Sequence, residues 1–165
     1  MKDRFHSMPP YDVVDAPEGD DPSLRPNQVV ALGLVYPLIE GDRARSALDV
    51  VTSKLLTPYG LRTLSPDDPR YQASYQGDQR ARDAAYHMGM AWPWLLGPYL
   101  DAHLRLNRNP AFVRSIVEPF DAHLRDAGLG TISEIFEPEP PYRPVGCIAQ
   151  AWSVSEVLRH VLALS

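Results

Sequence analysis

The sequence has little cysteine, no excess of positive charge and no long apolar run, and each shortage excludes a class of protein. Its one cysteine, Cys147, cannot form an internal disulfide, so we expect a structural thiol in a reducing compartment, the cytoplasm. The net charge of −5 opposes nucleic-acid binding, because phosphates repel an acidic chain. The longest apolar stretch, residues 29–39, is interrupted by Gly33 and Pro37. It is shorter than the roughly 20 residues that span a membrane, so no membrane partner is expected.

Patterns for several common chemistries are also missing. We find no glycine-rich phosphate loop, no paired-cysteine zinc pattern and no nucleophile elbow, so no metal and no organic cofactor is expected. The chain begins without an apolar run, which predicts no secretory signal. Its 165 residues and 44% hydrophobic content fit one folded domain, and 17 prolines predict long ordered loops. Residues 1–24 are polar and predicted to form an irregular arm before a structured region over residues 25–165.

Helical periodicity appears five times, which predicts an all-α fold of antiparallel helical hairpins. Pro26 suits the start of the first helix, while Asn109 can cap the fourth, with Pro110 at its first position. Gly41 is expected to end the first helix in a left-handed conformation, and Asp42 to cap the second. The predicted helices cover residues 26–39, 43–56, 93–106, 110–128 and 148–164.

The connections between these helices alternate between short and long. Successive connections of antiparallel helices lie at opposite ends, so both long loops, residues 57–86 and 129–146, should share one rim. Residues suited to a hydroxyl-rich ligand fall there, because aromatic faces stack on sugar rings and amides, imidazoles and guanidinium groups bond to hydroxyls. The candidate sugar-binding residues are Arg25, Asn27, Gln28, Tyr59, Arg62, Asp83, Tyr86, His87, Trp92, Trp94, Gln150 and Trp152.

Each candidate also has a plainer interpretation. The tryptophans could pack in the core, His87 could be a buried structural histidine, and the amides at positions 27 and 28 could cap a helix. Arg25 and Arg62 could pair with loop carboxylates such as Asp83. A repeated Asp-Ala-His-Leu-Arg string, at residues 101–105 and 121–125, suggests helix ends more than metal ligands, because no Cys/His cluster accompanies its histidines.

Glu134 is the candidate catalytic residue. It lies in the second long loop among the apolar residues Ile132, Ile135 and Phe136, and an apolar setting can poise a carboxyl group for acid–base work. The alternative is a loop glutamate that points at water.

Seven strings of the sequence, in order, resemble the C-terminal part of the amylo-α-1,6-glucosidase domain of bacterial and archaeal glycogen debranching enzymes. No single string is specific, but their order extends over nearly the whole chain. The strings are residues 24–28 (LRPNQ), 56–62 (LTPYGLR), 82–83 (RD), 85–87 (AYH), 92–94 (WPW), 130–136 (GTISEIF) and 146–153 (GCIAQAWS).

The resemblance implies a partial (α/α)6 toroid and hydrolysis of the single glucose at an α-1,6 branch point. It also implies an inverting reaction between two carboxyl groups about 6.5–9.5 Å apart, with Glu134 as general base. The general acid of the family belongs to an upstream Trp-Met-Asp segment that this chain lacks. We therefore expect an incomplete catalytic domain that acts on α-glucan together with an upstream half or a homo-oligomer. The alternatives are a non-catalytic α-glucan-binding fragment or subunit, and a purely structural helical domain.

Two departures from the family pattern touch the expected sugar site. After the histidine the family usually has Gln-Gly-Thr, whereas this chain has Met88-Gly-Met90, whose thioethers are poor hydrogen-bonding groups. After Phe136 the family usually has Asp-Gly, and here the residues are Glu137-Pro138. Altered specificity and relaxed selection on a fragment are both open explanations.

Overall fold

The computed structural model describes residues 10–164. Residues 1–9 and 165 lie outside the described residues, and with them the start of the chain and part of the predicted arm. Between residues 10 and 24 the backbone forms no helix, and Val13 and Asp21 form an antiparallel bridge. The division into an arm and a structured region stays a prediction.

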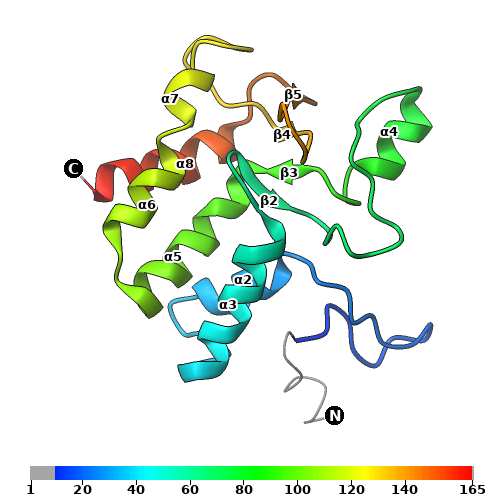
Figure 1. Ribbon diagram of the computed structural model, residues 1–165, viewed down its shortest axis with the longest axis vertical. Helices are drawn as coiled ribbons and strands as arrows, with labels where there is room; N and C mark the ends of the chain where they lie inside the picture. The colour runs from blue at the N-terminus through cyan, green and yellow to red at the C-terminus, as the bar shows by residue number, and fades with distance from the viewer. Residues whose placement is uncertain (1–9, 165) are drawn as a thin grey trace.

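Helices form most of the regular structure, and the predicted ones appear in the predicted order (Figure 1). A further helix over residues 79–85 lies inside the segment that was predicted as the first long loop. In α3 one face is apolar and buried, and it consists of Ala44, Ala47, Leu48, Val51 and Leu55. Asn109 caps α6 as predicted, with its side chain accepting from the backbone N–H of Phe112 at 3.1 Å. The helices are α2 (Asn27–Gly33), α3 (Gly41–Leu55), α4 (Gln79–Ala85), the 3-10 helix η1 (Pro93–Leu95), α5 (Leu96–Asn107), α6 (Pro110–Val117), α7 (Phe120–His123) and α8 (Ala151–Ala163).

Proline shortens two of the predicted helices. The first stops at Gly33 instead of residue 39, because the residue before Pro37 avoids the α conformation. The fourth breaks after Val117, where Pro119 lacks the N–H that an uninterrupted helix would use, and α7 starts behind it. Position 42 is not the cap of α3: Asp42 lies in the first turn, where its charge favours the positive helix end.

The all-α prediction missed a small antiparallel sheet with the strand order β1-β2-β3-β4-β5. Its strands hold only two or three residues each, too few for an alternating apolar pattern to reveal them. Leu61 pairs with Trp92, Ala91 with Phe136, and Ile135 with Val145. The strands are β1 (Leu56–Thr57), β2 (Gly60–Arg62), β3 (Ala91–Trp92), β4 (Ile135–Phe136) and β5 (Pro144–Val145).

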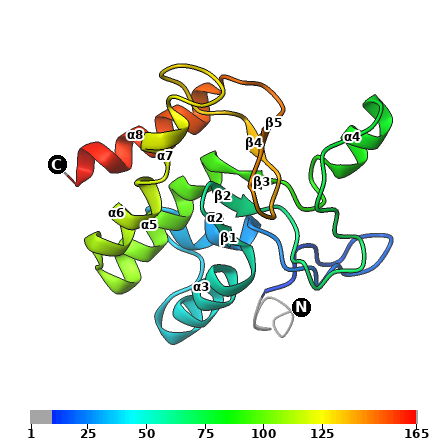
Figure 2. The ribbon, with the colours of Figure 1, turned by 45° about the horizontal axis from the view of Figure 1, so that its top comes forward.

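The sheet brings the two predicted long loops together, since β2 belongs to the first and β4 and β5 to the second. The short links lie at the other end of the helices (Figures 1 and 2). There Arg45 of α3 donates to the carbonyl of Leu106, and Arg105 of α5 donates to the carbonyl of Leu32. Helix α4 stands away from the other helices in both views.

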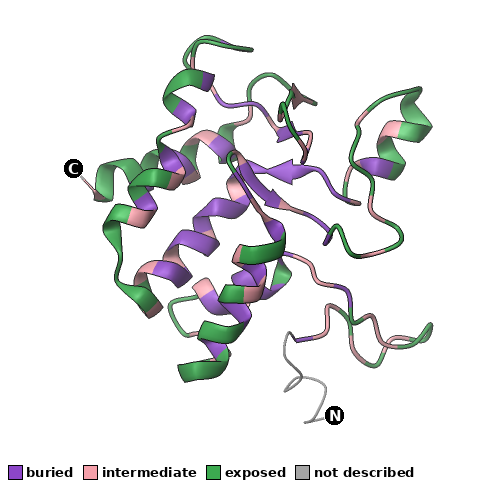
Figure 3. Cartoon of the chain, viewed as in Figure 1, coloured by how far each residue is buried: buried purple, intermediate pink, exposed green. Residues whose placement is uncertain are grey.

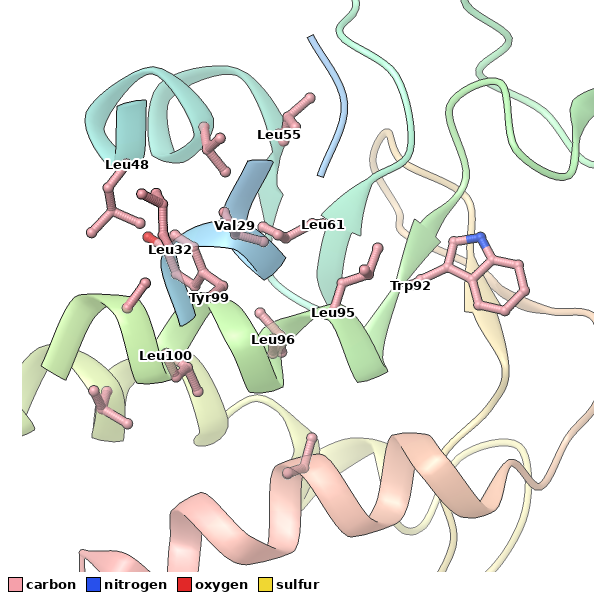
Figure 4. Close-up of a cluster of buried hydrophobic side chains, with 14 of the residues drawn as sticks. Val29, Leu32, Leu48, Leu55, Leu61, Trp92, Leu95, Leu96, Tyr99 and Leu100 are labelled. Carbon is pink, nitrogen blue, oxygen red and sulfur yellow. The ribbon is translucent and has the colours of Figure 1, made fainter. Parts of the chain in front are cut away.

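The core lies among α2, α3, α5 and the sheet, and half of the residues of α5 are buried (Figures 3 and 4). A methyl group on Gly33 would come within 2.5 Å of the carbonyl oxygen of Pro98, so α2 and α5 need glycine at their closest approach. The ring of Tyr99 is fully buried, and its hydroxyl bonds to Thr52 of α3 at 2.9 Å. Helices α2, α3, α6 and α8 all pack against α5.

An ionic cluster fastens α8 to α5. The guanidinium of Arg159 donates twice to Asp101, at 2.9 and 2.6 Å, and buried His160 contacts the same carboxylate at 3.1 Å. Burial alone would raise the pKa of Asp101, but the hydrogen bonds from His160 and Arg159 outweigh it and lower the pKa to about 2. Glu156, the remaining charged group of the cluster, accepts from Arg159 at 2.6 Å.

The substitution Asp101→Asn should destabilise the protein by about 1–2 kcal/mol, because it removes charged hydrogen bonds at a partly exposed site. The pKa of Asp101 in the folded state lies below its ordinary value of 3.8, so the unfolded chain takes up the proton first. The stabilisation is therefore complete above pH ~4 and lost as the pH falls towards ~2. Thermal unfolding of both proteins at several pH values measures it.

Asp121→Asn is the matched control, because Asp121 occupies the same place in the repeated string and is exposed. It should change stability little at any pH. Equal effects of the two substitutions would contradict a fastening role for Asp101.

Candidate functional site

The backbone around Glu134 is fixed by the hairpin of β4 and β5. Its N–H donates to the carbonyl of Cys147 at 2.8 Å, next to the paired residues Ile135 and Val145. The flanking residues Ser133 and Ile135 are buried, while Glu134 itself is partly exposed. The Glu134 side chain is therefore partly open to solvent, while its backbone is held in the hydrogen-bonded hairpin.

Three donors from distant segments hold the Glu134 carboxylate. Tyr86 donates its hydroxyl to Oε1 at 2.5 Å, and Gln150 donates its amide to the same oxygen at 3.1 Å. The backbone N–H of Cys147 donates to Oε2 at 3.0 Å. Burial, followed by the bond to Glu134, raises the pKa of Tyr86, so its hydroxyl keeps its proton at neutral pH.

Glu134 lies on the wall of an open cavity of about 540 Å3, which we call the carboxylate cavity. Asp83 of α4 lies on the same cavity, and within residues 10–164 its carboxylate takes part in no ion pair. Asp78 caps α4 by accepting from the N–H of Ala81 at 2.9 Å, which orients this helix beside the cavity. The lining residues are Tyr75, Arg82, Asp83, Tyr86, Glu134, Gly146 and Cys147.

A second cavity of about 210 Å3, the aromatic cavity, is lined by five of the other candidate residues. Trp94 and Trp152 stack there, with ring centroids 5.2 Å apart and planes at 23°. The lining residues are Pro26, Asn27, Thr63, His87, Trp92, Trp94, Leu95 and Trp152.

Aromatic contacts join the two cavities. The ring of Tyr86 meets His87 at 4.7 Å and Trp92 at 4.8 Å, while His87 stacks on Trp92 at 5.2 Å. The indole N–H of Trp92 donates to the carbonyl of Tyr86 at 3.2 Å. Only 4% of Trp92 is exposed, and its indole lies beyond β3 from the aliphatic core (Figure 4). Of these three residues in mutual contact, Tyr86 lines the carboxylate cavity, and His87 and Trp92 line the aromatic cavity.

Two candidates near the first helix serve packing contacts. Arg25 donates to the carbonyls of Thr63 and His87 at 3.0 and 2.9 Å and pairs with Asp12, so it ties segments together behind the aromatic cavity. Gln28 is buried and donates to the carbonyl of Pro10 at 2.5 Å. A role for either in sugar binding stays a prediction.

Arg62 and Tyr59 also lie outside the lining of both cavities. Arg62 donates to the carbonyl of Pro138 and pairs with Glu139 at 3.1 Å, not with Asp83. The ring of Tyr59 stacks on Phe136, with centroids 4.5 Å apart. Both residues join the first long loop to the second, and their binding roles likewise stay predictions.

The histidines of the repeated string have structural contacts. His103 stacks on Phe112 with centroids 4.1 Å apart, and His123 accepts from the N–H of Ser133 at 3.1 Å. Burial lowers the pKa of both, which keeps them neutral at pH 7. Within residues 10–164, no group of three His, Cys, Asp or Glu side chains could hold a metal ion.

Sequence reasoning did not select several residues that line the carboxylate cavity, among them Tyr75 and Arg82. Arg82, Gly146 and Cys147 belong to strings that carry the family resemblance, so those strings were an available signal. Tyr75 had no local signal, because its place depends on Glu137, whose carboxylate accepts from the N–H of Tyr75 at 3.1 Å.

Comparison with known proteins assigns the class of this chain. Residues 3–159 match the family described as Amylo-alpha-1,6-glucosidase, so the chain belongs to that family of glycoside hydrolases. A similar protein is the glycogen debranching enzyme of Saccharomyces cerevisiae, 31% identical over 117 residues. The match covers 66% of this chain but only 7% of the yeast enzyme. Among the described residues, no helix is long and apolar enough to cross a membrane.

Replacement of Gly146 by alanine should disturb Glu134 directly. Gly146 has φ +70°, and an added Cβ would lie 2.7 Å from Oε2 of Glu134 and 2.9 Å from buried Ile135. Gly130→Ala is the matched control, because Gly130 also has φ +70° but open space around it. We expect Gly146→Ala to lose about 1–3 kcal/mol more stability than Gly130→Ala, measured by denaturant unfolding. Equal losses would show that the contact with Glu134 does not constrain this position.

Proposed function

We propose that this chain takes part in the hydrolysis of α-1,6-linked glucose at the branch points of a cytoplasmic α-glucan such as glycogen, with Glu134 as general base. The observation that carries the proposal is the set of three donors on a carboxylate at a cavity wall. An ionised carboxylate offers about four acceptor positions. Three are taken by protein donors, which leaves room for one water molecule on the cavity side.

The chemistry follows from that arrangement. A water molecule bound to Glu134 gives its proton to the carboxylate as its oxygen attacks the anomeric carbon. The bond from that carbon to the glycosidic oxygen breaks, and an acid on the other side of the sugar protonates the leaving oxygen. The three donors hold the carboxylate in one position, and a general base needs a fixed position beside the water that it activates.

We propose further that the acid comes from an upstream half, which would complete an (α/α)6 toroid around this chain. Exposed apolar surface supports a covering partner, because large exposed apolar patches are rare in monomers. Val35 and Tyr36, after α2, are 88% and 87% exposed, and Leu158, Val161 and Leu162 of α8 are 49%, 43% and 63% exposed. A homo-oligomer could cover the same surface but would not supply the Trp-Met-Asp segment.

A second function has its own support: the chain binds α-glucan without cutting it. The aromatic cavity suits a sugar ring, and it includes neither Glu134 nor Asp83 among its lining residues. Binding without glucose release, both alone and with the upstream half, would favour this function over hydrolysis.

The test of hydrolysis is release of glucose from a branched limit dextrin. The chain is assayed alone and mixed with a separately expressed upstream half of a family member that carries the acid. We expect release only in the mixture, and its loss in Glu134→Gln, because an amide cannot take the proton. Glu118→Gln, at an exposed position on another segment, should leave release unchanged. Release that persists in Glu134→Gln would refute the assignment of the base.

Loss of the Tyr86 hydroxyl should slow the reaction without unfolding the protein. In Tyr86→Phe one charged hydrogen bond to Glu134 disappears, so we expect glucose release to slow by about 10- to 100-fold.

Tyr71→Phe is the matched control for Tyr86→Phe, since Tyr71 donates to Glu139 at 2.7 Å outside both cavities. It should leave the rate unchanged. An equal fall in rate in the two variants would contradict a specific role for the hydrogen bond from Tyr86 to Glu134.

A further inference from the structure

A loop segment, residues 71–75, joins the hairpin of β4 and β5 to the carboxylate cavity. Tyr75, its last residue, lines that cavity. Two glutamates of the turn between β4 and β5, Glu137 and Glu139, hold the segment at its two ends. Of the two, Glu137 is the one that meets the cavity-lining residue, since it accepts from the backbone N–H of Tyr75 at 3.1 Å.

Glu137 is itself firmly held in the hairpin. Its side chain is only 13% exposed, and Arg143 donates to its carboxylate at 2.8 Å. The backbone N–H of Glu137 also donates to the carbonyl of Arg143 at 2.9 Å, so this pair extends the pairing of β4 with β5. Burial alone would raise the pKa of Glu137, but the hydrogen bonds from Arg143 and from the N–H of Tyr75 outweigh it and lower the pKa. The side chain that holds Tyr75 is therefore charged at neutral pH.

We propose that Glu137 is a positioning residue, which fixes Tyr75 on the wall of the carboxylate cavity and thereby strengthens the binding of glucan there. The proposal rests on the proposed function in one respect, namely that a glucosyl unit occupies this cavity. Glu137 is also one of the two departures from the family pattern. The usual aspartate is shorter by one methylene group, which would hold its carboxylate farther from Tyr75.

The ring of Tyr75 is the part of the segment that reaches the site. Its centroid lies 6.0 Å from that of Tyr86, whose hydroxyl donates to Glu134. An aromatic ring in this place can pack on the apolar face of a sugar. Tyr86 is held independently, because the indole of Trp92 donates to its carbonyl at 3.2 Å. Loss of the Glu137 contact should therefore displace Tyr75 and leave the Glu134 carboxylate in place.

Cys147 allows a test that needs no glucan. It is the single cysteine of the chain, it is exposed, and it lines the carboxylate cavity together with Tyr75. Its rate of reaction with the neutral thiol reagent dithiodipyridine depends on access. Displacement of Tyr75 in Glu137→Ala should raise that rate about threefold. Glu137→Gln, which keeps an acceptor oxygen on a side chain of the same length, should restore most of the wild-type rate.

Glu139→Ala is the matched control for Glu137→Ala. Glu139 holds the other end of the same segment by accepting from the hydroxyl of Tyr71 at 2.7 Å, and Tyr71 lies outside the lining of both cavities. The control should leave the reaction rate of Cys147 unchanged. An unchanged rate in Glu137→Ala, or an equal rise in Glu139→Ala, would overturn the proposal.

Kinetics of glucose release test the consequence for binding. In the mixture with the upstream half, Glu137→Ala should raise the KM for limit dextrin about tenfold and change kcat by less than about twofold. The split is expected because Glu134 keeps its three donors, whereas the ring that packs on the sugar is displaced.

A second variant shows whether Glu137 acts through Tyr75. Tyr75→Ala leaves the ion pair of Glu137 with Arg143 in place and should raise KM by as much as Glu137→Ala. The double variant should show no further rise, because both substitutions remove the same ring from the cavity. A fall in kcat at unchanged KM, or additive effects of the two substitutions, would overturn the proposal.

Failure of the positioning role and failure of the hydrolytic function can be told apart. Glucose release that depends on Glu134, with an unchanged KM in Glu137→Ala, would refute the positioning role and leave the function standing. A faster reaction of Cys147 in Glu137→Ala but not in Glu139→Ala, without glucose release in the mixture, would support the fixing of Tyr75 and refute the function.

Discussion

The pairing of β3 with its two neighbours is the constraint on which the site depends. Ala91 pairs with both Arg62 and Phe136, so this strand of two residues joins the first long loop to the second. Tyr86, Glu134 and Gln150 are separated by 48 and 16 positions, and nothing local in the sequence would bring them together. A methyl group on Gly60 would meet the backbone of Trp92 at 2.5 Å, so even the approach of β2 to β3 requires glycine.

The sequence was informative where a pattern is local. The helical period and the cap at Asn109 are decided within a few residues, and α3, α5 and α6 begin close to where they were predicted. The strands were not predicted, because a segment of two or three residues is too short to show the alternating apolar pattern of a β-strand. The candidate Glu134 followed from its apolar neighbours and a family resemblance, but its three donors did not, because each comes from a different segment of the fold.

The two departures from the family pattern act at different places. Met90 is fully buried in the core, and neither Met88 nor Met90 lines a cavity, so the thioethers alter packing behind the site. Glu137, by contrast, accepts from Ser74, from the N–H of Tyr75 and from Arg143. It thereby ties the loop that carries a cavity-lining tyrosine to the hairpin that carries Glu134. This departure has a structural use in the chain, which relaxed selection alone does not explain.

The geometry at Glu134 also depends on contacts far from the cavity. Gln150 and Trp152 stand at the start of α8, and the ionic cluster of Asp101 with Arg159 and His160 lies near the other end of that helix. A methyl group on Gly97 would overlap the carboxylate of Glu156, so α5 and α8 touch closely between the two. Because α8 is one continuous helix of 13 residues, a shift at the cluster would move two groups together. These are the Gln150 amide that donates to Glu134 and the Trp152 indole that stacks on Trp94. The Glu134 carboxylate and the ring of Trp94 thus both contact the start of one helix, and a substitution that loosens this helix would affect both cavities at once.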